Sequence, residues 1–139
     1  MEKVLIGIDC DVEKSGVCYY FSKESFKLYN LTFFELFTTL KQTECNVKVY
    51  IEAGWLNKSN WHKISNGSAA INASIGLRTG ANHEVGRKIV EMCEYLEIEY
   101  ELIKPTKSKV NSETFNKITG HKGRTNQEQR DAAMLVFGR

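Results

Sequence analysis

Val4-Leu5-Ile6-Gly7-Ile8-Asp9 is the stretch of sequence that decides the fold. Five uncharged, mostly apolar residues in a row are typical of a central strand that is covered on both faces of a sheet. The run stops at an aspartate, whose charge is costly to bury without a cation or hydrogen-bonding partners. The stretch therefore predicts a central strand that places a carboxylate at the edge of the sheet.

Further elements are expected along the chain in the order β-β-β-α-β-α-β-α. Apolar runs and alternation predict the other strands at residues 16–21, 26–31, 47–52 and 99–103. Helices are expected to begin at Thr32, Ser68 and Thr125, with the second running to Leu96 and the third to the C-terminus. A hairpin followed by βαβ units predicts an α/β fold, with a mixed sheet and helices on both faces.

Capping boxes mark two of these helix starts, Thr32-x-x-Glu35 and Thr125-x-x-Glu128. Gly76 and Gly80 lie inside the long helical region, and each costs about 1 kcal/mol relative to alanine, so we expect a weak point there. Residues 104–124 are basic and polar and predict a loop or a short helix.

The length of 139 residues is that of a single domain, expected to span 1–139. No stretch is long and apolar enough to span a bilayer, so no membrane partner is expected. Residues 1–20 show no secretory signal, which predicts a cytoplasmic protein with reduced thiols. No C-x-x-C pair is present and the histidines are scattered, which argues against a zinc site. The four cysteines are Cys10, Cys18, Cys45 and Cys93.

The net charge of +2 is unevenly placed. Residues 54–88 and 104–126 are strongly basic, with Glu84 and Glu113 as their only acids, whereas residues 89–101 hold acids and no base. Such segments suit a polyanion that meets one side of the molecule. A solvated, lysine-rich surface is the alternative interpretation of the same pattern.

Three acids stand where a structural residue would be apolar or neutral. Asp9 and Glu52 end strands of the same apolar type, and Asp131 lies on the stripe of the last helix that should face the sheet. Glu128 lies one helical turn before Asp131, so both can point at one spot. The alternatives are structural: Asp9 caps a turn, Glu52 pairs with a lysine, and Glu128 belongs to the capping box.

Clustered carboxylates repel each other unless divalent cations bind between them. Parallel neighbouring strands would bring Asp9 and Glu52 to the carboxyl edge of the sheet, where open α/β sheets bind ligands. Mg²⁺ and Mn²⁺ prefer such oxygen ligands. Two ions about 4 Å apart can activate water and stabilise the leaving oxygen of a phosphodiester.

Several motifs together resemble a known family. Residues 6–9 (IGID) followed by 15–17 (SGV) resemble the first two strands of the RNase H-like superfamily, in particular Holliday-junction resolvases of the RuvC type. Glu52 falls at that family's second acid, and residues 75–80 (IGLRTG) are similar to its Leu-Gly-x-x-Arg-Gly segment. Residues 103–109 look like its fifth strand and Lys-containing exit, and residues 119–129 are similar to its glycine-bearing basic segment. Glu128-x-x-Asp131-Ala132 matches its closing Asp/His-x-x-Asp-Ala motif.

The resemblance implies an RNase H-like fold with a five-stranded mixed sheet of order 3-2-1-4-5. It implies Asp9, Glu52, Glu128 and Asp131 as the catalytic and metal-binding residues, with two Mg²⁺ ions that Mn²⁺ can replace. It also implies a homodimer, for which the small-residue helix 69–80 offers a surface unless it packs on its own sheet. The chain departs from the pattern at Cys10-Asp11-Val12, where Pro-Gly-Ser or Pro-Gly-Thr is usual, at Glu128, and in a shorter stretch after Pro105.

Basic and aromatic residues near these motifs are candidates for contacts with nucleic acid. Trp55 and Trp61 flank Lys58. Aromatic side chains beside basic residues can stack on unpaired nucleotides, although tryptophans as often belong to a core. The predicted nucleic-acid-binding residues are Lys58, Trp61, Arg78, Lys107, Lys109, Lys117, Lys122 and Arg124.

The sequence therefore predicts a magnesium-dependent, structure-selective endodeoxyribonuclease that hydrolyses branched DNA, most specifically Holliday junctions. In this prediction a water attacks the phosphorus in line, with no covalent enzyme intermediate. One alternative is the same chemistry on structured RNA, as in YqgF-type nucleases of the same fold. Another is a non-catalytic module that only binds nucleic acid or a protein.

Overall fold

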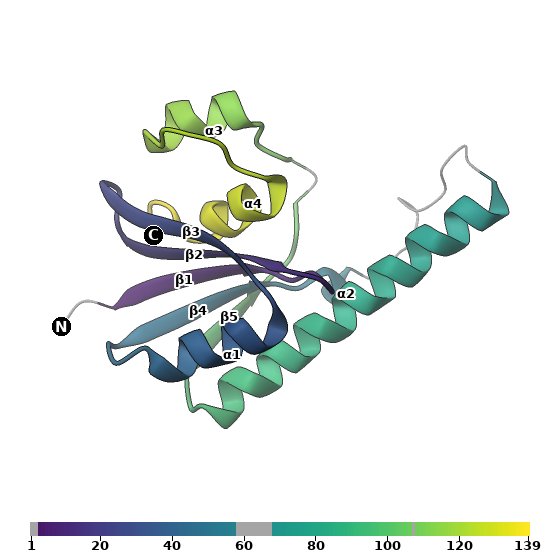
Figure 1. The fold of residues 1–139 in the computed structure, drawn as a ribbon, viewed down its shortest axis with the longest axis horizontal. Coiled ribbons are helices and arrows are strands. Elements are labelled where there is room, and N and C mark those ends of the chain that lie inside the picture. Colours follow the sequence, from purple (N-terminus) through teal and green to yellow (C-terminus); the bar gives the residue numbers. More distant parts are fainter. Residues whose placement is uncertain (1–2, 58–67, 107) are drawn as a thin grey trace.

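A single mixed sheet organises the chain, for which the computed structural model describes residues 3–57, 68–106 and 108–139 (Figure 1). The five strands are β1 (Val4–Asp9), β2 (Ser15–Ser22), β3 (Ser25–Leu31), β4 (Val47–Glu52) and β5 (Glu99–Ile103). Their order in the sheet is β3-β2-β1-β4-β5, with β1 antiparallel to β2 and parallel to β4. The predicted RNase H-like order is confirmed.

Helices cover both faces of this sheet, as predicted (Figure 1). They are α1 (Phe33–Gln42), α2 (Ala69–Tyr95), α3 (Ser112–Thr119) and α4 (Gln127–Val136), with a short 3₁₀ turn, η1 (Gly54–Leu56). α1 and α2 lie on one face and α4 on the other, with α3 packed beyond α4. The region that predicted a loop or short helix contains α3, and α2 continues unbroken through Gly76 and Gly80, where a weak point was expected.

Alternate residues of the central strands enter two separate cores. Ile8 of β1 and Ile51 of β4 face α1 and α2, in a cluster that includes Leu36 and Ile89. Tyr50 of β4 faces the other way, in a cluster with α3 and α4. Strand alternation therefore turns the next residues, Asp9 and Glu52, toward the α4 side of the sheet.

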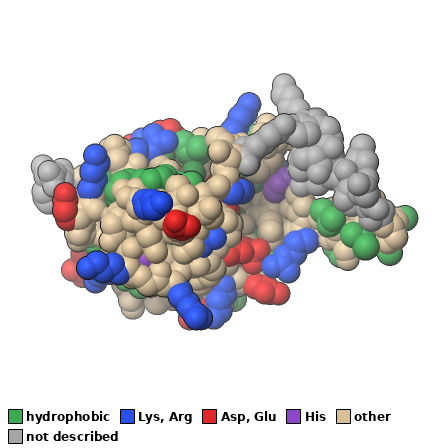
Figure 2. Space-filling view, turned by 90° about the horizontal axis from the view of Figure 1, so that it is seen from above, with side chains coloured by type: hydrophobic (Ala, Val, Ile, Leu, Met, Phe, Trp, Pro, Cys, Tyr) green, Lys and Arg blue, Asp and Glu red, His purple; other side chains and the backbone are tan. Residues whose placement is uncertain are grey.

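α2 has two unlike halves. Its second half packs on the sheet through Ile89, Met92 and Cys93, whereas its first half projects beyond the sheet (Figure 1). Ile71 and Leu77 on the projecting half are 53% and 77% exposed, and Figure 2 shows hydrophobic side chains gathered there. This half does not pack against its own sheet, so that alternative is wrong.

One predicted cap is confirmed and the other is wrong. Thr32 and Glu35 form the capping box of α1. The box of α4 is formed one residue later than predicted, by Asn126 and Gln129, while Thr125 accepts hydrogen bonds from Arg130 instead. Because Gln129 fills the box, the structural explanation of Glu128 as a capping residue does not hold.

Candidate metal centre

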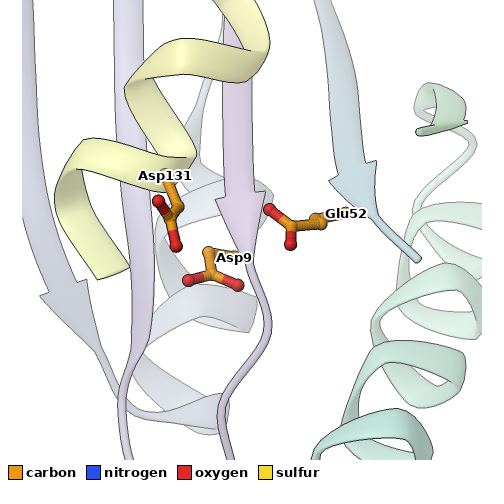
Figure 3. Close-up of side chains that lie close together, drawn as sticks. All are labelled: Asp9, Glu52 and Asp131. Atoms are coloured by element: carbon orange, nitrogen blue, oxygen red, sulfur yellow. The ribbon is translucent and has the colours of Figure 1, made fainter. Parts of the chain in front are cut away.

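Three carboxylates from distant parts of the chain meet at one edge of the sheet. Asp9 ends β1, Glu52 ends β4, and Asp131 lies on α4; one oxygen from each is within 4.8 Å of the other two (Figure 3). β1 and β4 are parallel and in register, so their carboxyl ends reach the same edge. The convergence predicted from the sequence is therefore present.

Two glycines let α4 lie directly on the strands and bring Asp131 to this edge. A Cβ atom on Gly7 would be 2.0 Å from the carbonyl oxygen of Ala132, and one on Gly16 would be 2.1 Å from that of Glu128. No side chain fits in either place, so glycine is required by the close approach of the helix backbone. Asp131, next to Ala132, is thereby held beside the end of β1.

Burial and mutual repulsion dominate the electrostatics of the three acids. The side chains of Glu52 and Asp131 are 15% and 10% exposed. Burial raises the pKa of Asp9 to about 8, and the charges of Glu52 and Asp131 push it in the same direction. Burial also raises the pKa of Glu52. The carboxylates of Asp9 and Glu52 are therefore poorly satisfied as anions by the protein alone.

Lys109 is the basic residue that the described chain places among these acids. Its Nζ lies 2.8 Å from Oδ2 of Asp131 and 3.8 Å from Oε1 of Glu52. The hydrogen bond to Asp131 and the nearby negative charges outweigh the effect of burial and raise the pKa of Lys109. Gln127 donates from Nε2 to the other oxygen of Asp131 at 2.8 Å. Glu52 therefore does pair with a lysine, as the alternative predicted, but that lysine is half exposed and is shared with Asp131.

The donor set fits a hard divalent cation. The group consists of carboxylates from Asp9, Glu52 and Asp131, with no histidine or cysteine in it. Mg²⁺ and Mn²⁺ take such ligands. Glu128 lies outside the group, on the same helix as Asp131 and one turn before it, and its charge contributes to raising the pKa of Asp9.

A small hollow of about 150 Å³ opens beside the centre toward α2. Its walls include Asp9 and Glu52 and, from α2, Thr79, Asn82 and His83. Sequence reasoning missed these α2 residues. Their spacing of three and four positions, which puts polar groups on one face of the helix, is the pattern that could have found them.

Trp55 belongs to the packing of α2, as the core interpretation expected. A Cβ on Gly86 would lie 2.3 Å from its ring, and Cζ of Arg87 is 5.6 Å from the ring centroid. Trp61 and Lys58 lie outside the described residues, as does Lys107. Their predicted contacts with nucleic acid stay predictions.

The other predicted basic contacts fall into different settings. Arg78 on α2 is 3.3 Å from Asp11, in the turn after β1, so it braces that turn. Lys117 pairs with Glu113 along the exposed side of α3. Lys122 and Arg124 are exposed in the segment between α3 and α4.

The segment between α3 and α4 lies alongside the edge strand β3. His121 stacks near Phe26, with ring centroids 5.9 Å apart, and the side chain of Asn126 donates to that of Asn30 at 2.6 Å. Asn30 pairs with Gly16, which in turn pairs with Asp9. The chain thus runs along β3 from the far end of the sheet back to the edge that carries the acids.

Comparisons with known proteins agree with this fold. Neither a protein-family model nor a curated protein matches the sequence. Among solved structures, RuvC of Thermus thermophilus in complex with a Holliday-junction substrate matches with a TM-score of 0.54 and 11% identity, over 96% of this chain and 90% of that one. A second structure of Thermus thermophilus RuvC matches with a TM-score of 0.49 and 14% identity, over 95% and 90% of the two chains. The first of these matches shows that the chain has a RuvC-type fold. No helix among the described residues is long and apolar enough to cross a membrane.

Proposed function

We propose that this protein is a metal-dependent endonuclease that hydrolyses phosphodiester bonds in branched DNA, with Holliday junctions as its substrate. The observation that carries the proposal is the meeting of Asp9, Glu52 and Asp131, from β1, β4 and α4, on a RuvC-type fold. The protein with that fold, RuvC of Thermus thermophilus, has been seen in complex with a Holliday junction. Substrate class and metal dependence are extended from it to this chain as part of the proposal.

Mg²⁺ would be held by Asp9, Glu52 and Asp131, with Glu128 assisting and with Mn²⁺ as a substitute; two ions are proposed. When bound, such ions supply Lewis acidity that activates water and stabilises charge on the phosphate. The protein's own residues arrange this chemistry. Gln127 orients Asp131 through its 2.8 Å hydrogen bond, and the strand ends fix the other two carboxylates.

Lys109 changes partner in this proposal. In the structure its ammonium lies beside Asp131 and Glu52 and balances their charge. A cation bound by those acids would weaken that attraction and free a half-exposed ammonium beside the scissile phosphate. There it stabilises negative charge that develops in the transition state.

A homodimer is proposed because two cuts in opposite strands of a junction need two centres. The projecting half of α2 offers the surface, with the exposed apolar residues Ile71, Ile75 and Leu77. A Cβ on Gly76 or Gly80 would meet nothing within 4 Å, so another backbone can approach closely there. Two-fold interfaces are self-complementary, and an exposed apolar helix suits one.

Cleavage of matched substrates tests the proposed function. We expect incision of a four-way DNA junction in Mg²⁺ or Mn²⁺, and loss of incision in EDTA. A linear DNA duplex of the same sequence should be cut at least about tenfold more slowly, because specificity here is for the branch. A structured RNA of similar size is assayed in parallel.

The outcomes separate the candidate functions. Faster cleavage of the RNA than of the junction would assign the chemistry to RNA. Binding of the junction without any cleavage, together with no uptake of Mn²⁺, would reduce the protein to a binding module.

A further inference from the structure

A second and larger hollow lies along the side of α4, and no role has yet been assigned to it. It has a volume of about 360 Å³ and is bounded by α4 and by the chain that leaves β5. We call it the lateral groove. Its lining includes Glu52 and Asp131 of the metal centre at one place and Arg139 at another, so the groove is continuous with the centre.

The charge of the lateral groove suits a polyanion. Three cations line it, Lys104, Lys109 and Arg139, together with the hydroxyl residues Thr106 and Ser108. The acids among its lining residues are Glu52 and Asp131, which belong to the metal centre. Its lining also includes the apolar residues Ile103, Pro105, Val110, Met134 and Leu135, against which sugars can lie. A phosphodiester chain offers this combination of anionic groups and apolar sugar edges.

Arg139 is held in position before any ligand arrives. Its Nε donates to the carbonyl oxygen of Leu135 at 2.6 Å, and its Cζ lies 4.7 Å from the ring centroid of Tyr50. Within the described part of the chain, neither Arg139 nor Lys104 forms an ion pair. An arginine fixed by its Nε and its flat face still presents two nitrogens to a phosphate.

The spacing along the groove corresponds to a few nucleotides. Asp131 and Leu135 are one helical turn apart, and Arg139 follows after one more step of four residues. α4 ends at Val136, so the helical rise of 1.5 Å per residue covers about 7.5 Å from Asp131, and Arg139 lies beyond the end of the helix. A stacked strand rises 3.4 Å per nucleotide, so Arg139 stands a few nucleotides from the metal centre.

We propose that the lateral groove binds the backbone of the cleaved DNA strand on one side of the scissile phosphate. Arg139 contacts a phosphate a few nucleotides away, and Lys104 contacts another along the same groove. This inference rests on the proposed function and extends it by assigning a path to the strand. Lys104 begins the basic segment 104–126, whereas Arg139 was not predicted from the sequence, because only the fold brings the end of α4 beside β4.

Salt-dependent binding of a four-way DNA junction tests this path, with Ca²⁺ in place of Mg²⁺ to prevent cutting. We expect Arg139→Gln and Lys104→Gln each to weaken binding about fivefold, and each to lower the slope of log Kd against log salt by about 1. Arg139→Lys keeps the charge and should keep the slope. Lys41→Gln, on α1 at the opposite face of the sheet, is the matched control and should change neither quantity.

Neutral linkages locate the contact along the strand. A single methylphosphonate is placed in turn at each of the few positions next to the scissile bond. At one of them it should weaken binding by wild type about fivefold, and binding by Arg139→Gln hardly at all, because the contact is already lost. If both glutamine variants bind and respond to salt like Lys41→Gln while wild type still cuts the junction, the lateral groove is not the path and the proposed function stands. If wild type neither binds nor cuts any junction, the proposed function and the groove proposal both fail.

Discussion

Two clusters of charge lie on β4 and its neighbours, one near each end of the strand, and they are built in opposite ways. Near its start, Glu99 and Glu101 are half exposed and are matched by Lys3 and Lys48. At its end, Asp9, Glu52 and Asp131 are largely buried and share Lys109. One cluster balances its charge with surface lysines, and the other leaves an excess of anions.

The pKa directions express the same contrast. The hydrogen bond from Lys3 lowers the pKa of Glu99, whereas burial raises that of Asp9. A paired surface carboxylate needs nothing further and contributes little to stability. A buried excess of carboxylates is costly, and it is found where a metal or substrate supplies the missing positive charge. The difference supports the proposal that the carboxyl end of β4 carries the functional site.

The largest expected effect separates the two clusters by catalysis. Asp131→Asn keeps the shape of the side chain and removes one of the acidic ligands, so junction cleavage in Mg²⁺ should fall by about 10³-fold or more. Glu99→Gln at the other end of the strand should cut at the wild-type rate. Rates are measured under single-turnover conditions with saturating enzyme.

Binding of the junction in Ca²⁺ is the companion measurement, and Asp131→Asn should retain it within a few-fold. If Asp131→Asn cuts as fast as Glu99→Gln, the two clusters do not differ in function and the assignment of the metal centre is wrong.

Stability against pH should also distinguish the clusters in the metal-free protein. The unfolded chain releases the Asp9 proton near its ordinary pKa of 3.8, whereas the folded protein keeps it until about pH 8. Between these values the folded state binds the extra proton, so stability falls as pH rises, by about 1.4 kcal/mol per pH unit from this group. Chemical denaturation should show a loss of about 3 kcal/mol between pH 5.5 and pH 8.

Asp9→Asn should abolish most of that slope and should make the metal-free protein more stable at pH 8. Glu99→Gln should instead lower the stability at neutral pH. The lowered pKa of Glu99 stabilises the folded state at pH values above the unfolded pKa, and this stabilisation disappears on acidification. Added Mg²⁺ should reverse the slope, since it binds the ionised carboxylates. An unchanged slope in Asp9→Asn would show that its carboxylate is not the buried acid described here.

Much of the fold and of the acidic cluster could be predicted from local sequence. The apolar run that ends at Asp9 and the alternating strand that ends at Glu52 place their acids at one edge once the strands are parallel. Asp131 is recognisable because it interrupts the stripe of α4 that faces the sheet. These predictions rest on periodicities of two and 3.6 residues, which the chain carries within short windows.

Other features depend on contacts between distant segments and could not be predicted. Thr125-x-x-Glu128 and Asn126-x-x-Gln129 are equally good capping boxes one residue apart, and the hydrogen bonds of Thr125 with Arg130 and of Asn126 with Asn30 favour the second. The glycine at position 16 is explained only by the backbone of α4. Arg78 was expected to bind nucleic acid, and its pairing with Asp11 appears only when α2 lies beside the turn after β1.

The smallest expected effect concerns Lys109 as the counter-charge of the centre. A divalent cation must compete with its ammonium for Asp131 and Glu52, so Lys109→Met should tighten Mg²⁺ binding about fivefold, which corresponds to about 1 kcal/mol. The measurement is calorimetric titration without DNA at a series of pH values above 8, because Lys109 lowers the pKa of Asp9 and its loss lets protons compete more strongly in the variant. The tighter binding is expected at the high end of this series. Lys48→Met, which removes the matching lysine from the balanced cluster, is the control and should leave the Mg²⁺ affinity unchanged. Weaker Mg²⁺ binding by Lys109→Met than by Lys48→Met would mean that the lysine helps to assemble the carboxylates, and its role as a competing cation would be wrong.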